Sequence, residues 1–341
     1  MLPIVFSLAL AAAAPAQASR AAGVHAESAD FSKLIPAGAK VEVLSDGYTW
    51  SEGPIWIAQG QFLLLSDPPK NRMYRWAPGA LSASVFLEPS GGRDARGFRE
   101  AGSNGLKPAG AGRLLVADEG NRAIALLDLR SKTKRLLAQR YDGKKLNSPN
   151  DIAVGPDGAI WFTDPPYGLE GVDDSPAKEQ AANRVYRLGA DGKLNAAVSE
   201  LRYPNGIAFS RDGRTLYVSN SDPKNAVILA FGVGRGGVLS RRRVFADMNA
   251  LAAKGLPGLP DGMTIDEHGN LWASGPGGIH VFTPSGHELG LISTGVAISN
   301  AAFGGPDGRT LFMTSTHQLV ALRTKVRGAP VRLPKLAGMV R

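Results

Sequence analysis

The chain has 341 residues with 42 glycines, 23 prolines and no cysteine, and only 20% of its residues are charged. The absence of cysteine excludes a disulfide framework, a thiolate zinc site and a cysteine nucleophile. The formal net charge is +9, but aromatic residues are too sparse for base stacking, so we read Arg241–Arg243 as a solvated basic face and expect no nucleic-acid partner.

The first segment, residues 1–18, is apolar and ends in Ala16-Gln17-Ala18, which predicts a signal peptide cleaved after Ala18. The alternative is a membrane anchor, but the apolar run is shorter than the roughly 20 residues that a spanning helix needs. We therefore expect an exported protein, periplasmic or secreted, with no membrane insertion of the mature chain. Residues 19–30 are expected to be a flexible N-terminal segment.

From residue 51 onward, one pattern of two short apolar runs around a glycine-containing turn recurs six times. A typical copy is "SPNDIAVGPDGAIWFTD", and each copy opens on a polar anchor residue. In chain order the anchors are Glu52, Asn104, Asn150, Asn205, Asp261 and Asn300. Their spacing of about 40 to 55 residues is typical of four-stranded propeller blades. The sequence thus predicts an all-β fold, a six-bladed β-propeller over residues 31–330, followed by a C-terminal tail at 331–341.

The outer strands of a blade are also readable from the sequence. Arg184–Leu188 and Leu194–Ser199 flank an Ala-Asp-Gly turn and complete the blade that begins near Asn150. The last blade is one strand short, and we expect Lys40–Ser45 to supply that strand and close the ring. The alternative fold, a β-sandwich, gives no reason for one polar anchor to recur six times.

Propeller geometry brings the anchors together, because the innermost strands of all blades start around one central channel. Glu52, Asn150, Asn205 and Asp261 would then present two carboxylates and two amide oxygens, a donor set that favours Ca²⁺, replaceable by another divalent cation such as Zn²⁺, Mn²⁺ or Mg²⁺. Taken singly, an Asn or Asp before glycine is an ordinary turn residue. Asn104 and Asn300 are open between metal ligands, substrate contacts and turns.

The segments "SEGPIW", "SPNDIAVGPDGAIWFTDPPYG", "YPNGIAFSRDGRTLYVS", "LPDGMTIDEHGNLWAS" and "NAAFGGPDGRTLF" together resemble the SMP-30/gluconolactonase/luciferin-regenerating-enzyme-like family of six-bladed propellers. The resemblance implies a metal-dependent, usually Ca²⁺-dependent, lactonase. It implies that Glu52, Asn205 and Asp261 bind the metal, that Asn150 binds it or contacts the substrate beside it, and that Asp261 is the catalytic general base or nucleophile.

The chain departs from the family pattern at two places. Some members carry arginine where this chain has Ser148, and bacterial members commonly have Glu-His-Gly-Asn-Arg where this chain reads Asp118-Glu119-Gly120-Asn121-Arg122. Substrate contacts at these two places should therefore differ from those of other members.

The leading functional hypothesis is a hydrolase that opens lactone rings, with gluconolactone-type sugar lactones as the first substrates to consider. Asn104, Asn150 and Asn300 are the candidate substrate-binding residues. The rim loops Glu88–Ser103 and Pro165–Asn183 are expected to select the substrate. Two alternatives stay open, an organophosphate or ester hydrolase with the same metal site, and a non-catalytic ligand-binding propeller. The sequence leaves the oligomeric state open.

Overall fold

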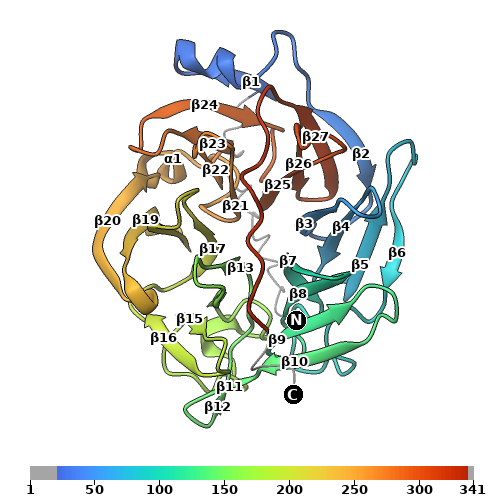
Figure 1. Cartoon of the computed structure of the whole chain (residues 1–341), viewed down its shortest axis with the longest axis vertical. Helices are drawn as coiled ribbons and strands as arrows, with labels where there is room; N and C mark the ends of the chain where they lie inside the picture. The colour runs from blue at the N-terminus through green and yellow to red at the C-terminus, as the bar shows by residue number, and fades with distance from the viewer. Residues whose placement is uncertain (1–20, 337–341) are drawn as a thin grey trace, which may run out of the picture.

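The computed structural model describes residues 21–336, and these form a ring of six small β-sheets around a central axis (Figure 1). The predicted six-bladed β-propeller is confirmed. The predicted signal peptide lies outside the described residues. Within the described part of the chain, no helix has the length and apolar character needed to cross a membrane.

Each blade is an antiparallel sheet whose first strand lies nearest the ring axis. Blades 1 and 2 consist of β3 (Glu52–Ile57), β4 (Phe62–Asp67), β5 (Arg72–Trp76) and β6 (Ser84–Leu87), then β7 (Ser103–Gly110), β8 (Arg113–Asp118), β9 (Ala123–Asp128) and β10 (Lys134–Ala138). Blades 3 and 4 consist of β13 (Ile152–Val154), β14 (Ile160–Asp164), β15 (Arg184–Leu188) and β16 (Leu194–Val198), then β17 (Pro204–Phe209), β18 (Thr215–Asp222), β19 (Asn225–Val233) and β20 (Leu239–Asp247).

Blades 5 and 6 each include a strand from the N-terminal part of the chain. Blade 5 consists of β21 (Met263–Ile265), β22 (Leu271–Gly275), β23 (Gly278–Phe282), β24 (Glu288–Ser293) and β1 (Gly23–Ala26), and blade 6 of β25 (Asn300–Gly304), β26 (Thr310–Ser315), β27 (Gln318–Arg323) and β2 (Glu42–Asp46). The remaining elements are a hairpin of β11 (Arg140–Tyr141) and β12 (Lys144–Lys145), the helix α1 (Asn249–Ala253), and three short 3₁₀ turns, Ala29–Lys33, Val172–Asp174 and Arg235–Gly237.

The ring closes as the sequence predicts. Strand β2 pairs antiparallel with β27, with Glu42 opposite Ala321 and Asp46 opposite Gln318. A strand from near the start of the chain thus completes the last blade, which leaves β27 without a free edge.

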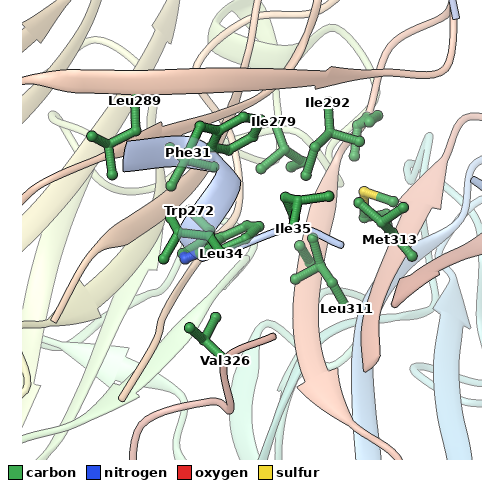
Figure 2. Close-up of a cluster of buried hydrophobic side chains, with 14 of the residues drawn as sticks. Phe31, Leu34, Ile35, Trp272, Ile279, Leu289, Ile292, Leu311, Met313 and Val326 are labelled. Atoms are coloured by element: carbon green, nitrogen blue, oxygen red, sulfur yellow. The ribbon is translucent and has the colours of Figure 1, made fainter. Parts of the chain in front are cut away.

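The N-terminal segment 19–30, expected to be flexible, contributes structure from residue 23 onward. Strand β1 extends blade 5 by pairing with β24. The 3₁₀ turn that follows places Phe31, Leu34 and Ile35 among buried side chains of blades 5 and 6, such as Trp272 and Leu311 (Figure 2). Apolar burial of about 25 cal/mol per Å² explains why this short segment is held against the ring.

The hydrophobic core is divided among the gaps between neighbouring blades. The second strand of a blade is buried on both faces, as in β14, where Ile160, Trp161 and Phe162 are all buried. Ile160 and Phe162 pack toward the cluster shared with blade 2, and Trp161 packs toward blade 4. The alternation of strand side chains therefore fastens each blade to both of its neighbours.

The C-terminal residues 324–336 cross the ring as an extended strap, the dark red coil in Figure 1. The Ala329 amide donates to the Ile265 carbonyl (2.8 Å), and the Lys335 amide donates to the Gly158 carbonyl (2.9 Å). Gly158 lies in the turn between the first two strands of blade 3, with a φ of 82° that favours glycine. Since the anchors stand at the opposite ends of the first strands, the strap lies across the end of the channel away from them.

We expect removal of residues 329–341 to lower the thermal midpoint by about 5 °C, because the strap ties blades 3, 4 and 5 together. Metal binding at the anchor end should be unchanged. Differential scanning calorimetry and calcium titration measure the two effects. Arg332→Ala, which deletes the guanidinium contacts to the Ser210 (3.1 Å) and Arg211 (2.6 Å) carbonyls and leaves the rest of the strap in place, should give a smaller shift. An unchanged midpoint in the truncated protein would show that the strap is not a structural tie.

Candidate metal and substrate site

A cavity of about 760 Å³ opens at the end of the ring where the first strands begin. Most of the predicted anchors meet there, and residues of six connecting segments complete its wall. The lining residues are Thr49, Trp50, Glu52, Arg99, Glu100, Asn104, Asn150, Tyr167, Asn205, Ser221, Pro223, Ala252, Gly255, Leu256, Gly258, Leu259, Asp261, Ala297 and Ile298.

Five of the six anchors line this cavity, each at or next to the start of a first strand. Glu52 begins β3, while Asn150 and Asp261 stand just before β13 and β21. Asn104 and Asn205 are second in β7 and β17. The sixth anchor, Asn300, does not line the cavity. Its Nδ2 donates to Glu52 Oε2 (3.3 Å), and its Oδ1 accepts from the Ala301 amide (2.9 Å), so Asn300 orients Glu52.

Two acidic anchors share the cavity and repel each other. Burial, opposed by the hydrogen bond from the Gly53 amide and reinforced by the nearby Asp151 carboxylate, raises the pKa of Glu52 to about 7. Burial also raises the pKa of Asp261 well above its usual value, followed by repulsion from Glu52 and Asp151. A divalent cation between Glu52 and Asp261 would relieve this repulsion.

The side-chain amide of Asn205 is held by its nitrogen, which leaves its oxygen available as a ligand. Its Nδ2 donates to Ser221 Oγ (2.9 Å), and Ser221 Oγ in turn donates to the Pro260 carbonyl (2.5 Å). Asn205 Oδ1 is buried and has no hydrogen-bond partner among residues 21–336. A buried carbonyl oxygen without a partner is costly, and a cation is one group that would satisfy it.

Asn104 is oriented in the same manner by a residue behind the cavity wall. Its Nδ2 donates to Glu119 Oε1 (3.1 Å), and its buried Oδ1 is again without a partner in the described part of the chain. Asn104 therefore presents an acceptor. Asn150 is buried, lines the cavity and makes no side-chain hydrogen bond within the described residues.

The donor set fits a hard divalent cation rather than a soft one. Glu52, Asn150, Asn205 and Asp261 offer only carboxylate and amide oxygens, the ligands of Ca²⁺. No group of three or more His, Cys, Asp or Glu side chains suited to a metal occurs in residues 21–336. A metal here would accordingly depend on asparagine oxygens.

The sequence predicts two rim loops above the site but does not indicate which of their residues line it. Arg99 and Glu100 come from the first loop and Tyr167 from the second, and all three line the cavity. Arg99 Nη2 donates to Glu100 Oε1. The third wall, formed by the end of α1 and residues 255–259, was not predicted. The only signal for it was the unusually long apolar connection between β20 and β21.

The comparisons with known proteins agree with this fold. Residues 50–317 match the family described as SMP-30/Gluconolactonase/LRE-like region, and the chain belongs to this family. It is 44% identical over 301 residues to a gluconolactonase of Zymomonas mobilis subsp. mobilis, covering 86% of this chain and 84% of that one.

A pentonolactonase of Haloferax volcanii is 26% identical over 274 residues, covering 77% of this chain and 80% of that one. Among solved structures, a gluconolactonase from Xanthomonas campestris superposes with a TM-score of 0.76 at 36% identity, covering 92% of this chain and 99% of that one. The calcium-binding protein regucalcin from Agrobacterium tumefaciens has the same fold, with a TM-score of 0.67 at 20% identity over 87% of this chain and 97% of that one.

Proposed function

We propose that this protein is a Ca²⁺-dependent hydrolase of sugar lactones of the gluconolactone type. The observation that carries the proposal is a cavity lined by two mutually repelling carboxylates, Glu52 and Asp261, and by Asn205, whose buried amide oxygen has no partner among residues 21–336. The similarity to gluconolactonases supports a lactone as the substrate. The shared fold with regucalcin, which is described as a calcium-binding protein, supports calcium as the metal. The predicted signal peptide supports a periplasmic or secreted location.

In this proposal Glu52, Asn150, Asn205 and Asp261 hold the cation. A bound Ca²⁺ supplies Lewis-acid polarisation of the lactone carbonyl and offsets the charge of the tetrahedral intermediate. The ligand residues are already oriented before substrate arrives. Ser221 fixes the Asn205 amide, and Asn300 fixes the Glu52 carboxylate, so neither has to reorganise during the reaction.

Asp261 is the proposed general base or nucleophile. As a base, its carboxylate accepts a proton while water adds to the lactone carbonyl carbon; the ring C–O bond then breaks, and that proton passes to the ring oxygen. As a nucleophile, Asp261 would attack the carbonyl carbon and form an anhydride acyl-enzyme while the ring C–O bond breaks and the ring oxygen takes a proton from water; a second water would then hydrolyse the anhydride and return the free carboxylate. Both routes yield the same hydroxy acid. Asp261 is half-buried and lines the cavity, so a substrate there can reach its carboxylate in either route.

The free oxygen of Asn104 is proposed to accept a hydrogen bond from a substrate hydroxyl. Glu119→Ala should then raise KM for a sugar lactone by about tenfold, because the unheld amide can rotate and lose its orientation. Glu119→Gln is the matched control, since its amide oxygen can still accept from Asn104. Steady-state kinetics separate the two variants. Equal KM values in both variants would show that Glu119 does not act through Asn104.

A substrate panel tests the proposed function. Hydrolysis rates of δ-gluconolactone, an alkyl δ-lactone, an aryl ester and an organophosphate triester are measured on the purified protein with calcium. We expect the sugar lactone to give the highest kcat/KM. A preference for the aryl ester or the triester would favour the alternative ester or organophosphate hydrolase, and no turnover with any of the four would favour a ligand-binding propeller.

A further inference from the structure

Tyr167 belongs to the rim loop Pro165–Asn183 and lines the cavity that holds the proposed site. It lines the cavity together with Ser221 and Asp261. Its hydroxyl is within interaction range of the Ser221 hydroxyl and within electrostatic range of the Asp261 carboxylate. Tyr167 thus brings a phenol to the carboxylate proposed to act on the lactone.

Ser148 holds the backbone on both sides of Tyr167. Ser148 Oγ donates to the Pro165 carbonyl (2.7 Å) and accepts from the Gly168 amide (2.9 Å), which clamps the loop on both sides of Tyr167. Ser148 is fully buried. The serine that departs from the family pattern is therefore a support for the Tyr167 loop rather than a substrate contact.

The other rim loop holds Gly168 from a second direction. The amides of Arg99 and Glu100 both donate to the Gly168 carbonyl (2.9 and 3.2 Å). A Cβ on residue 168 would lie 2.8 Å from the Ser148 Cβ and 3.0 Å from the Glu100 carbonyl oxygen, so only glycine allows this close approach. The two rim loops are thereby joined at the residue next to Tyr167.

The ring and the hydroxyl of Tyr167 are positioned separately. The ring stacks on Tyr203, with centroids 5.6 Å apart and an angle of 26° between the planes. Ser221 Oγ already donates to Pro260 and accepts from Asn205, which leaves one lone pair for the Tyr167 hydroxyl. Rotation about the C–O bond can redirect that O–H toward a bound substrate without moving the ring.

We propose that Tyr167 is a further catalytic residue. Its hydroxyl donates a hydrogen bond to the ring oxygen of the lactone, on which negative charge develops as the ring C–O bond breaks. This inference rests on the proposed lactonase function. Asp261, being an acceptor when ionised, cannot supply that hydrogen bond, and Asn104 and Asn205 present oxygens to the cavity. The Tyr167 hydroxyl is therefore a donor where the neighbouring anchors are acceptors.

The Tyr167 phenol is a hydrogen-bond donor at neutral pH, because a tyrosine hydroxyl ordinarily ionises only at about pH 10.

The test compares Tyr167→Phe with Tyr203→Phe at saturating calcium. Tyr203 is the stacking partner, and its hydroxyl is directed to Asp173 and Arg202 rather than to the cavity, so Tyr203→Phe controls for loss of a phenol from the stacked pair. We expect Tyr167→Phe to lower kcat for δ-gluconolactone by about 10²-fold or more with little change in KM, because a preorganised donor acts mainly in the transition state. Tyr203→Phe should stay within about twofold of wild type. Calcium titration and thermal melting should be near wild type for both variants.

Ser148→Ala gives a second, independent perturbation that leaves the phenol in place. Loss of the two loop hydrogen bonds should lower kcat by less than Tyr167→Phe does, with calcium affinity unchanged. Wild-type kcat in Tyr167→Phe, or equal losses in Tyr167→Phe and Tyr203→Phe, would overturn the assignment of Tyr167 while leaving the lactonase function in place. A wild-type protein that opens no lactone would overturn both.

Discussion

Asp261→Asn is expected to lower kcat for lactone hydrolysis by about 10³-fold, because the amide can neither accept the proton from water nor attack the carbonyl carbon. The fold should survive, since the exchange is nearly isosteric and removes one of two repelling carboxylates from a buried site. Stopped assays at saturating calcium, together with circular dichroism, measure the two effects.

Asp212→Asn is the matched control for this variant. Asp212 lies in the turn between β17 and β18, at the end of the ring away from the cavity, where it accepts from the Arg214 amide (3.0 Å). It should retain full kcat. Retention of more than about a tenth of wild-type kcat in Asp261→Asn would remove Asp261 from the chemical step.

Glu52→Gln is expected to weaken calcium binding by about 100-fold, because it removes one of the two charges that balance the cation. The metal-free variant should also melt a few degrees higher than metal-free wild type at pH 8. The reason is that burial and Asp151 raise the pKa of Glu52 from 4.5 to about 7. Ionisation of this carboxylate therefore lowers stability progressively between these two pH values and fully at pH 8, whereas the neutral amide avoids this cost.

Opposite shifts in calcium affinity and in metal-free stability distinguish a metal ligand from a structural carboxylate. Isothermal titration calorimetry and thermal melting measure them, with the exposed Glu42→Gln as control. Because protons and calcium compete for the same carboxylates, the affinity of wild type should also fall as the pH is lowered. A Glu52→Gln protein that binds calcium as tightly as wild type would exclude Glu52 as a ligand.

The repeat made the fold and much of the cavity predictable. Once one polar anchor recurs at blade spacing, the ring, its closure by β2 and the convergence of residues as distant as Glu52 and Asp261 follow from geometry. The orientation of each anchor was not predictable, because it depends on partners such as Ser221 and Glu119 that come from other strands. Asn300 shows this best, since the structure directs both ends of its amide to Glu52 and Ala301 and away from the cavity.

The position of the rim loops could be predicted from the sequence, but the roles of their residues could not. Loops carry no periodicity, so nothing in the sequence indicated that Tyr167 enters the cavity or that Gly168 joins the two loops. Comparison with a family pattern alone made Ser148 look like a lost substrate contact, whereas its hydrogen bonds show a support for the loop. The C-terminal strap was likewise expected only as a tail, because its contacts are to backbone carbonyls of turns far away in sequence.

The most direct test of a metal-dependent lactonase is removal and return of the metal. The protein is stripped with a chelator and passed through a desalting column, and δ-gluconolactone hydrolysis is followed by acid release before and after addition of calcium, with magnesium, manganese and zinc in parallel. We expect turnover to be lost on stripping, the fold to be retained, and one equivalent of calcium per chain to restore the rate. Full lactone turnover in the stripped protein would contradict a metal-dependent lactonase.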